Sequence, residues 1–347
     1  MLRASNVQTL PWADKTKSML KARRLEVCDD ILAARPDAGL FSGCTAANVE
    51  KLWAFSYDGL EHPHSAVLHT PAALQALVMT RLPAEAALLT LDEHLILERM
   101  LILDGVTPLM DYEEMETVLS LVRRMWCTLT YEGGEPVLHL PKELVLPLQQ
   151  LLETPTHQEI REKLARFDLT MRSLLYVGGL LHVSVPMQRM METVLKDTYA
   201  ANEQLVMRYL KAAYDYTYTP GGDMLLLHPG LADPDRLLPR LRESLSNPAS
   251  IPQETLLQAM HGLLPEEQPV FDRVFGTLIE AVRPEITPEE AAIDLLILAK
   301  QSVTLQEMNE VLGSLLTVQP TRAMLDAVQE MHMLTPRWGT MRTGMVQ

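Results

Sequence analysis

Three histidines in the N-terminal quarter of the chain come closest to a pattern that could bind a metal. His62 and His64 flank Pro63, and His69 follows shortly after them. Neutral imidazole is a good ligand for zinc or copper. A metal site needs further ligands, and no cysteine or carboxylate stands at a suitable spacing from these histidines. The sequence therefore predicts a solvated loop here, and we assign no metal ligand.

The motifs of catalysis and cofactor binding are missing from the sequence as well. Gly178-Gly179 and Gly221-Gly222 lack the neighbouring residues of a phosphate-binding loop, and there is no GxSxG, HExxH or CxxC. Paired acids such as Glu289-Glu290 stand at predicted helix starts, where the helix dipole explains them. We assign no catalytic or cofactor-binding residue and expect a protein that is not an enzyme. An active site assembled from distant residues stays open as an alternative.

A recurring passage joins a β-prone run with a tyrosine, a glycine-containing turn, and an apolar run that ends in Leu-His near a proline. Its three copies span residues 54–71, 127–141 and 214–229, and their histidines are His69, His139 and His228. The pattern predicts β-hairpins. A histidine at a strand end can hydrogen-bond a backbone group and hold the exit from the hairpin. No nucleophile or carboxylate recurs beside these histidines, so we expect their role to be structural.

Predicted helices precede the second and third of these hairpins. The helices span residues 91–103 and 111–126 before the second hairpin, with a turn at 104–108, and residues 157–177, 185–195 and 199–213 before the third. Helices followed by a two-stranded hairpin describe a winged-helix pattern. A spacing of roughly 70–90 residues between copies suits one small domain each. The alternative is that hairpins with glycine turns recur by chance.

The C-terminal part of the chain has a different sequence pattern: prolines separate short predicted helices, and no strand is evident. Its predicted helices cover residues 253–261, 268–282, 288–300, 304–316 and 320–331. We therefore predict a mainly α fold with short β-hairpins, made of tandem winged-helix-like units followed by a helical C-terminal domain. The predicted boundaries are 1–88 for an N-terminal helical and hairpin unit, 89–154 and 155–245 for two winged-helix-like units, and 246–347 for the helical domain with a loose tail.

The net charge of −15 bears on the class of partner. An acidic chain repels phosphate unless its basic residues are segregated. The predicted recognition helix 111–126 carries four acids against two arginines, and helix 199–213 carries one acid against two basic residues. These charges disfavour nucleic acid, and we predict an interaction or scaffold protein that binds another protein.

A transcription-related nucleic-acid-binding protein is the alternative function. It depends on a basic stretch within the amphipathic helix that we predict for residues 14–34. The basic side chains of that stretch, which could contact nucleic acid or a partner, are Lys15, Lys17, Lys21, Arg23 and Arg24. A solvated helix face explains the same residues without any ligand.

The cysteines and the apolar segments predict a cytoplasmic protein. Cys28, Cys44 and Cys127 are odd in number and far apart, which fits reduced thiols. The first residues contain no apolar run typical of a signal peptide. The most hydrophobic segment, residues 88–103, is interrupted by charged residues and is not expected to cross a membrane.

Several short phrases give the chain a resemblance to a known group of proteins. They are Val137–Leu144 (VLHLPKEL), Leu174–Leu181 (LLYVGGLL), Leu227–Pro229 (LHP) and Thr335–Trp338 (TPRW). Their order resembles uncharacterised bacterial proteins that often carry a SEC-C zinc-binding motif, sometimes beside a Rho-N-like segment. The resemblance implies no established activity. The cysteines of a SEC-C motif would lie near the C-terminus, but this chain has no cysteine after Cys127, so no zinc ligand is carried over.

Overall fold

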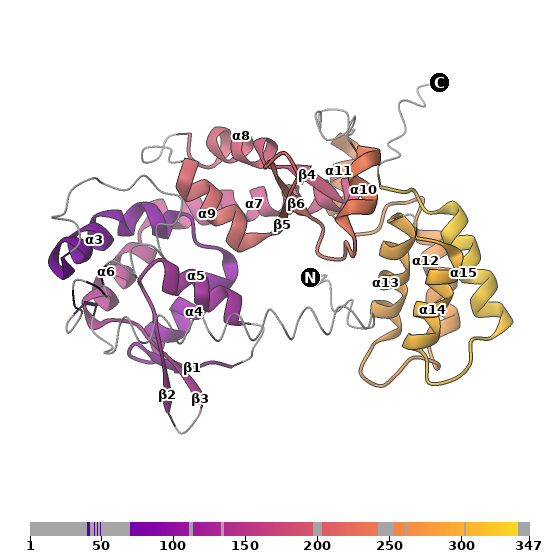
Figure 1. Cartoon of the computed structure of the whole chain (residues 1–347), viewed down its shortest axis with the longest axis horizontal. Coiled ribbons are helices and arrows are strands. Elements are labelled where there is room, and N and C mark those ends of the chain that lie inside the picture. The colour runs from indigo at the N-terminus through magenta and orange to yellow at the C-terminus, as the bar shows by residue number, and fades with distance from the viewer. Residues whose placement is uncertain are drawn as a thin grey trace. The chain divides into compact units, whose positions relative to one another are not determined.

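A computed structural model of the protein describes residues 40, 41, 45, 47, 49, 70–110, 114–132, 135–196, 203–241, 253–260, 262–301 and 303–338. Over these residues the chain is mainly helical, with two small antiparallel sheets of three strands each (Figure 1). The predicted mainly α fold with short hairpins is thereby confirmed. The first predicted hairpin, at residues 54–71, lies outside the described residues.

The described residues divide into two compact units. The unit that we call the N-terminal unit contains the described residues of Ser18–Ala165 together with Met190–Ala213. The C-terminal unit contains Arg166–Arg189 and the described residues from Tyr214 onward. The four-part division drawn from the sequence stays a prediction.

The N-terminal unit combines helices with the first sheet. Its elements are α3 (Pro71–Ala87), α4 (Leu91–Ile102), β1 (Val106–Pro108), α5 (Met115–Arg123), β2 (Thr128–Glu132), β3 (Glu135–His139), α6 (Lys142–Leu152), the start of α7 (Pro155–Gly178), the end of α8 (Ser184–Thr193) and α9 (Glu203–Ala213). The strands lie in the order β1-β3-β2, and β2 and β3 form the predicted second hairpin, with Thr128 opposite His139. Apolar residues of α3, α4, α5, α6 and the sheet share one core with Leu40, Phe41 and Val49.

The C-terminal unit repeats the strand order of the first sheet and adds a helical bundle. Its elements are the end of α7, β4 (Leu180–His182), the start of α8, β5 (Asp215–Tyr218), β6 (Met224–Leu227), α10 (Pro234–Leu241), α11 (Gln253–Met260), α12 (Gln268–Leu278), α13 (Pro288–Lys300), α14 (Leu305–Leu315) and α15 (Arg322–Leu334). The sheet has the order β4-β6-β5, and β5 and β6 form the predicted third hairpin. Helices α12 to α15 bury a second core.

The helices of the bundle begin where the sequence predicts. Thr287 caps α13, because its hydroxyl accepts from the backbone amide of Glu290 while the Glu290 carboxylate accepts from the amide of Thr287. Thr304 and Glu307 make the same reciprocal pair at α14. Such a reciprocal pair is called a capping box, and each one satisfies two backbone N–H donors that a helix start leaves without a partner.

The outer strands β1 and β4 correct the sequence-based prediction. Residues 104–108 were predicted to be a turn, but Val106–Pro108 pairs with β3. Leu180–His182, where no strand was predicted, pairs with β6. Strands of three residues are too short to show an alternating pattern, so they are defined by the partner strand and not by their own sequence.

No helix among the described residues is both long and apolar enough to cross a membrane.

Candidate functional site

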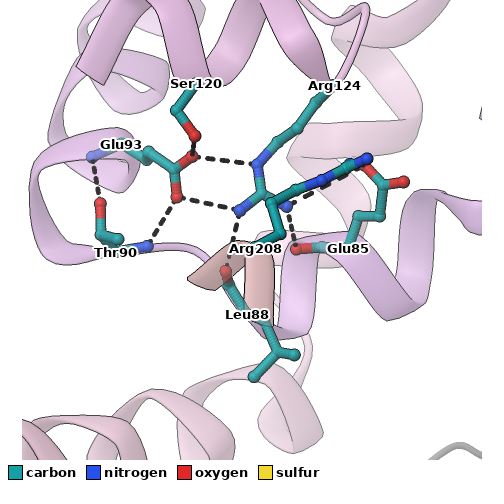
Figure 2. Close-up of polar contacts among 7 residues, drawn as sticks. All are labelled: Glu85, Leu88, Thr90, Glu93, Ser120, Arg124 and Arg208. Carbon is teal, nitrogen blue, oxygen red and sulfur yellow. Dashed lines mark hydrogen bonds and ion pairs between the residues drawn. The ribbon is translucent and has the colours of Figure 1, made fainter. Parts of the chain in front are cut away.

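Helix α4 is positioned at its first turn by a capping box. The Thr90 hydroxyl accepts from the backbone amide of Glu93 at 3.1 Å, and the Glu93 carboxylate accepts from the amide of Thr90 at 2.8 Å (Figure 2). Glu93 is completely buried. A buried carboxylate needs more partners than one amide, and these come from α5.

Arg124, at the end of α5, is the centre of the buried ionic network around Glu93. Its Nε and Nη2 atoms donate to the two oxygens of Glu93 at 3.0 and 3.1 Å (Figure 2). The same guanidinium donates to the carbonyls of Glu85 and Leu88, each at 3.0 Å. Ser120 adds a third side-chain donor to Glu93, at 2.6 Å. This bidentate pairing joins the end of α3, the start of α4 and the end of α5.

A second arginine completes the charge balance of this network. Glu85 is also buried, with 2 % of its surface exposed. Its carboxylate lies 3.2 Å from Nη1 of Arg208 and 3.9 Å from Nη1 of Arg124. Two carboxylates thus face two guanidinium groups, with Arg208 contributed by α9 (Figure 2). The two positive and two negative charges of the network balance one another, so we infer that the network stabilises the packing of helices within the N-terminal unit.

Histidines hold the middle of α4 against the start of α7. His94 and His157 are both buried, and their rings stack with centroids 6.0 Å apart. His94 hydrogen-bonds Glu98 at 2.8 Å and also contacts Arg161. Burial, then the Arg161 charge, lowers the pKa of His94, although Glu98 opposes the shift. Burial, helped by His94 and Arg161, lowers the pKa of His157 to about 4. Both rings are therefore neutral at pH 7.

The C-terminal end of α4 is held by a turn and an ion pair. Asp104 adopts φ 57° and Gly105 φ 90°, and the amide of Gly105 reaches the carbonyl of Met100 at 2.7 Å. This is the Schellman arrangement that closes helices. Arg99 makes a bidentate pair with Glu114 at 2.8 and 2.9 Å, and Glu114 also accepts from the amide of Met110 at 3.1 Å. The segment that follows α4 is thus tied to the start of α5.

Three apolar side chains of α4 are exposed. Leu91, Leu95 and Ile102 are 44 %, 51 % and 82 % exposed. Separations of four and seven residues put their side chains on one face of the helix. Three further exposed apolar residues follow in the next segment of the chain. We call the set the α4 face; its members are Leu91, Leu95, Ile102, Leu103, Val106 and Met110.

Acidic side chains accompany the α4 face. Asp92 and Asp104 are exposed, and the Glu98 side chain is half exposed. The adjacent cation Arg99 is bound to Glu114 and only 27 % exposed in its side chain. Apolar side chains on a firmly held helix with acidic neighbours can bind an apolar segment that carries basic residues. They offer no group for bond making or breaking.

The sequence-based interpretation missed both the network and the α4 face. Two signals were present in the sequence. Thr90-x-x-Glu93 is a capping-box pattern, and Leu91, Leu95 and Ile102 recur at helical spacing. Neither signal tells that Glu93 bonds to an arginine 31 residues later, or that these three apolar residues lie away from the core.

A second buried ion pair lies in the C-terminal unit. Lys300 donates to Glu267, and the Tyr176 hydroxyl donates to the other oxygen of the same carboxylate. The ammonium of Lys300 stands 4.2 Å from the centre of the Tyr176 ring. Burial lowers the pKa of Lys300 against the opposing effect of Glu267, and burial raises the pKa of Tyr176. Trp338 covers the group, since its backbone amide donates to the backbone carbonyl of Lys300 and its indole N–H donates to the backbone carbonyl of Tyr176.

A lysine, a glutamate and a tyrosine in contact are residue types that active sites use, but these side chains are closed off from solvent. Lys300 is 1 % exposed, Glu267 is completely buried, and both are satisfied by each other. A substrate would have to displace Trp338, which is itself 1 % exposed. The pair therefore serves to join α7, α12, α13 and the segment after α15.

Two of the three recurring histidines are within the described residues. At His228 the predicted backbone bond is present, because Nδ1 accepts from the amide of Gly230 at 3.0 Å. Burial and the Lys300 charge lower the pKa of His228 to about 4. His139 instead pairs through Nε2 with the Thr130 hydroxyl at 2.7 Å, across the hairpin.

The remaining sequence-predicted positions lie outside the described residues. They are the loop histidines His62, His64 and His69 and the basic residues Lys15, Lys17, Lys21, Arg23 and Arg24. Where the structure describes the chain, no group of three or more histidine, cysteine or acidic residues is arranged to hold a metal ion.

Over the described residues, the geometry defines a mainly helical protein with two small sheets, two buried ionic clusters and the exposed α4 face. No family model matches the chain, and neither a curated protein nor a solved structure shows significant similarity to it. The resemblance to proteins that carry SEC-C motifs stays a prediction.

Proposed function

We propose that the protein is a non-enzymatic, cytoplasmic interaction or scaffold protein that binds another protein through the α4 face. The exposure of Leu91, Leu95 and Ile102 on one side of a helix is the observation that carries this proposal. Exposed apolar residues that gather on one face are typical of protein-binding surfaces, whereas single ones are ordinary.

The proposed partner presents an amphipathic segment with basic residues. Apolar side chains at helical spacing match the α4 face, and lysine or arginine matches the adjacent Asp92, Glu98 and Asp104. Fully burying an exposed leucine or isoleucine side chain is worth about 1.5–3 kcal/mol, and Ile102, the most exposed residue of the α4 face, has the most to gain. The anchored position of α4 adds to affinity, because little order is lost on binding.

Binding of nucleic acid is the less favoured function. Of the four basic residues in the helices that would enter a groove, Arg124 and Arg208 are engaged with buried glutamates. They are not free to contact phosphate. The alternative therefore depends on the basic stretch Lys15–Arg24 together with Arg123 and Lys211.

We also propose the two sheets as the wings of tandem winged-helix-like units. Both sheets have the strand order first-third-second, and in both the last two strands form a hairpin that follows helices. Such a frame binds protein as readily as nucleic acid, and the surface residues decide between them.

Capture from the native cell with two matched variants tests the protein-binding proposal. Ile102→Asp alters the α4 face, and Ile279→Asp alters an exposed isoleucine of the C-terminal unit as the control. We expect a partner that is retained by the wild type and by Ile279→Asp and is lost with Ile102→Asp. A photo-crosslinker at position 95 should join the same partner. Identical sets of captured proteins for the three forms, or no captured protein at all, would refute the proposal.

A titration with labelled duplex DNA tests the alternative. Micromolar binding that weakens steeply with salt, and that disappears when Lys15, Lys17, Lys21, Arg23 and Arg24 are replaced by alanine, would favour nucleic acid over protein. We expect no such binding.

A further inference from the structure

Two neighbouring imidazole rings are buried where α4 meets the start of α7, and each leaves one nitrogen unsatisfied. His94 is 2 % exposed, His157 is 3 % exposed, and their ring centroids lie 6.0 Å apart. Among the residues that the structure describes, neither Nδ1 of His94 nor Nε2 of His157 has a hydrogen-bond partner. Most buried polar atoms are hydrogen-bonded, so two unsatisfied nitrogens on adjacent rings need an explanation.

These two nitrogens decide which protonation state the contact accepts. A neutral imidazole carries hydrogen on one ring nitrogen, whereas an imidazolium carries it on both. Protonated His94 would therefore bury an N–H at Nδ1, and protonated His157 would bury one at Nε2, with no acceptor for either. Burying a charged donor without a partner costs more than burying the neutral ring. The contact between α4 and α7 thus selects neutral rings.

The charges around the rings act in the same direction. Arg161 of α7 opposes protonation of both rings, and His94 opposes protonation of His157. Glu98 favours a charge on His94, but the Glu98 side chain is 50 % exposed, so water weakens this attraction. The other charged side chains that the structure describes on α4, α5 and the start of α7 are exposed or paired elsewhere: Asp92, Arg123 and Glu162 are exposed, and Glu93 pairs with Arg124, Arg99 with Glu114, and Glu159 with Lys163.

The first turn of α7 has few other contacts that would hold it in place. Residues 155, 156, 158 and 159 are exposed, and His157 is the buried side chain among them. The Thr154 hydroxyl caps the turn by accepting from the amide of His157 at 3.3 Å. Firm packing resumes at Ile160, which is 2 % exposed. Helix ends with few buried apolar side chains open at a lower free energy than the core, so this turn can open by itself.

We propose that the first turn of α7 is an acid-sensitive joint, which leaves α4 when His94 or His157 takes up a proton, while the rest of the N-terminal unit stays folded. In the open turn both rings lie in water, where every N–H finds an acceptor. This device is independent of the α4 face and of any partner. Histidine suits it, because its unperturbed pKa lies within the range of cellular pH changes.

The expected size of the response follows from His157. Burial, with His94 and Arg161, lowers its pKa to about 4 in the closed joint, against 6.5 for a ring in water. The open form therefore binds the proton first, and opening increases as the pH falls. These two values raise the open population about twentyfold between pH 7 and pH 5. We expect about tenfold, because solvent screens part of the effect.

Hydrogen exchange of the full-length protein at pH 7 and pH 5 tests the joint, with the intrinsic pH dependence of exchange divided out. The amides of residues 158–161 donate to carbonyls at and just before the first turn of α7, so they report on its opening. Their protection should fall about tenfold at pH 5. The amides of α5, in the same unit, should keep their protection.

Two variants and a control assign the response to the rings. His94→Leu combined with His157→Leu removes both titrating groups, so the protection of residues 158–161 should no longer depend on pH. Arg161→Gln keeps both rings and removes the cation that opposes their protonation, so the fall in protection at pH 5 should be smaller than in the wild type. His182→Leu removes a histidine of the C-terminal unit and should leave the response unchanged.

The outcomes that contradict the joint are distinct from one another. Equal protection of residues 158–161 at the two pH values overturns it, and so does a fall that the double leucine variant retains. A fall of the same size in α5 at pH 5 overturns it as well, because the whole unit would then be unfolding. If the double variant loses protection in α5 already at pH 7, Arg161→Gln decides: a response equal to that of the wild type overturns the joint, and a smaller one supports it.

Discussion

Replacing Arg124 by methionine tests whether the buried ionic network holds the N-terminal unit together. The guanidinium group is 2 % exposed and donates to Glu93 and to the carbonyls of Glu85 and Leu88. Methionine keeps an unbranched apolar stem of similar reach and removes every donor. The Glu93 carboxylate is left buried without its cation, although Ser120 and the Thr90 amide still donate to it.

The expected cost follows from the loss of one partner of a buried pair. Breaking such a pair destabilises a protein by about 3–5 kcal/mol, because the remaining charge stays out of water without compensation. With a urea dependence of about 2 kcal/mol per molar, the unfolding midpoint of the N-terminal unit should fall by about 1.5–2.5 M.

Hydrogen exchange during a urea titration measures this cost unit by unit. Peptides from α4 and α5 report on the N-terminal unit, and peptides from α13 and α14 report on the C-terminal unit, where no change is expected. The matched control is Arg123→Met, which alters the neighbouring exposed arginine and should shift the midpoint by less than about 0.5 M.

A double variant separates the ion pair from general damage. Combining Glu93→Gln with Arg124→Met removes both charges, so the combined cost should fall below the sum of the single costs by about 1–3 kcal/mol. A midpoint for Arg124→Met that equals that of Arg123→Met, or single costs that simply add, would refute the reasoning.

Three further perturbations address the histidines, a crowded glycine and the second ion pair. Because the pKa of His157 is lowered to about 4 from 6.5, the unfolded chain binds the proton first, so the N-terminal unit should lose stability as the pH falls from 6.5 to 4, by no more than about 3 kcal/mol because solvent screens part of the effect; His157→Leu should flatten that slope in pH-dependent unfolding. Gly179→Ala should cost about 2–4 kcal/mol, because φ is 78° and the new Cβ would lie 2.5 Å from the Trp338 ring, whereas Gly178→Ala has open space and should be neutral or mildly stabilising in the same melts. Lys300→Met should cost about 3–5 kcal/mol in the C-terminal unit alone, and a cost below about 1 kcal/mol would contradict a buried, charged pair.

Local patterns in the sequence were enough to predict helices α11 to α15 and the two described hairpins. Thr287 with Glu290 predicts the start of α13, because the capping atoms and the amides that they satisfy are neighbours in the chain. The Gly221-Gly222 turn predicts the β5–β6 hairpin for the same reason, and Gly222 takes the positive φ of 89° that glycine tolerates. In these elements the interacting groups lie within a few residues of each other.

Tertiary structure alone decided the parts that involve distant residues. Strands β1 and β4 exist because β3 and β6 supply their hydrogen bonds, and three residues carry no pattern of their own. Arg124 counted in the sequence as a cation that phosphate could attract, but it pairs with Glu93 inside the unit. Ile96 and Ile102 belong to one helix, yet the first is buried and the second is the most exposed residue of the α4 face. Composition and helical spacing set which residues share a helix face, whereas the packing of the other elements sets which face remains in water.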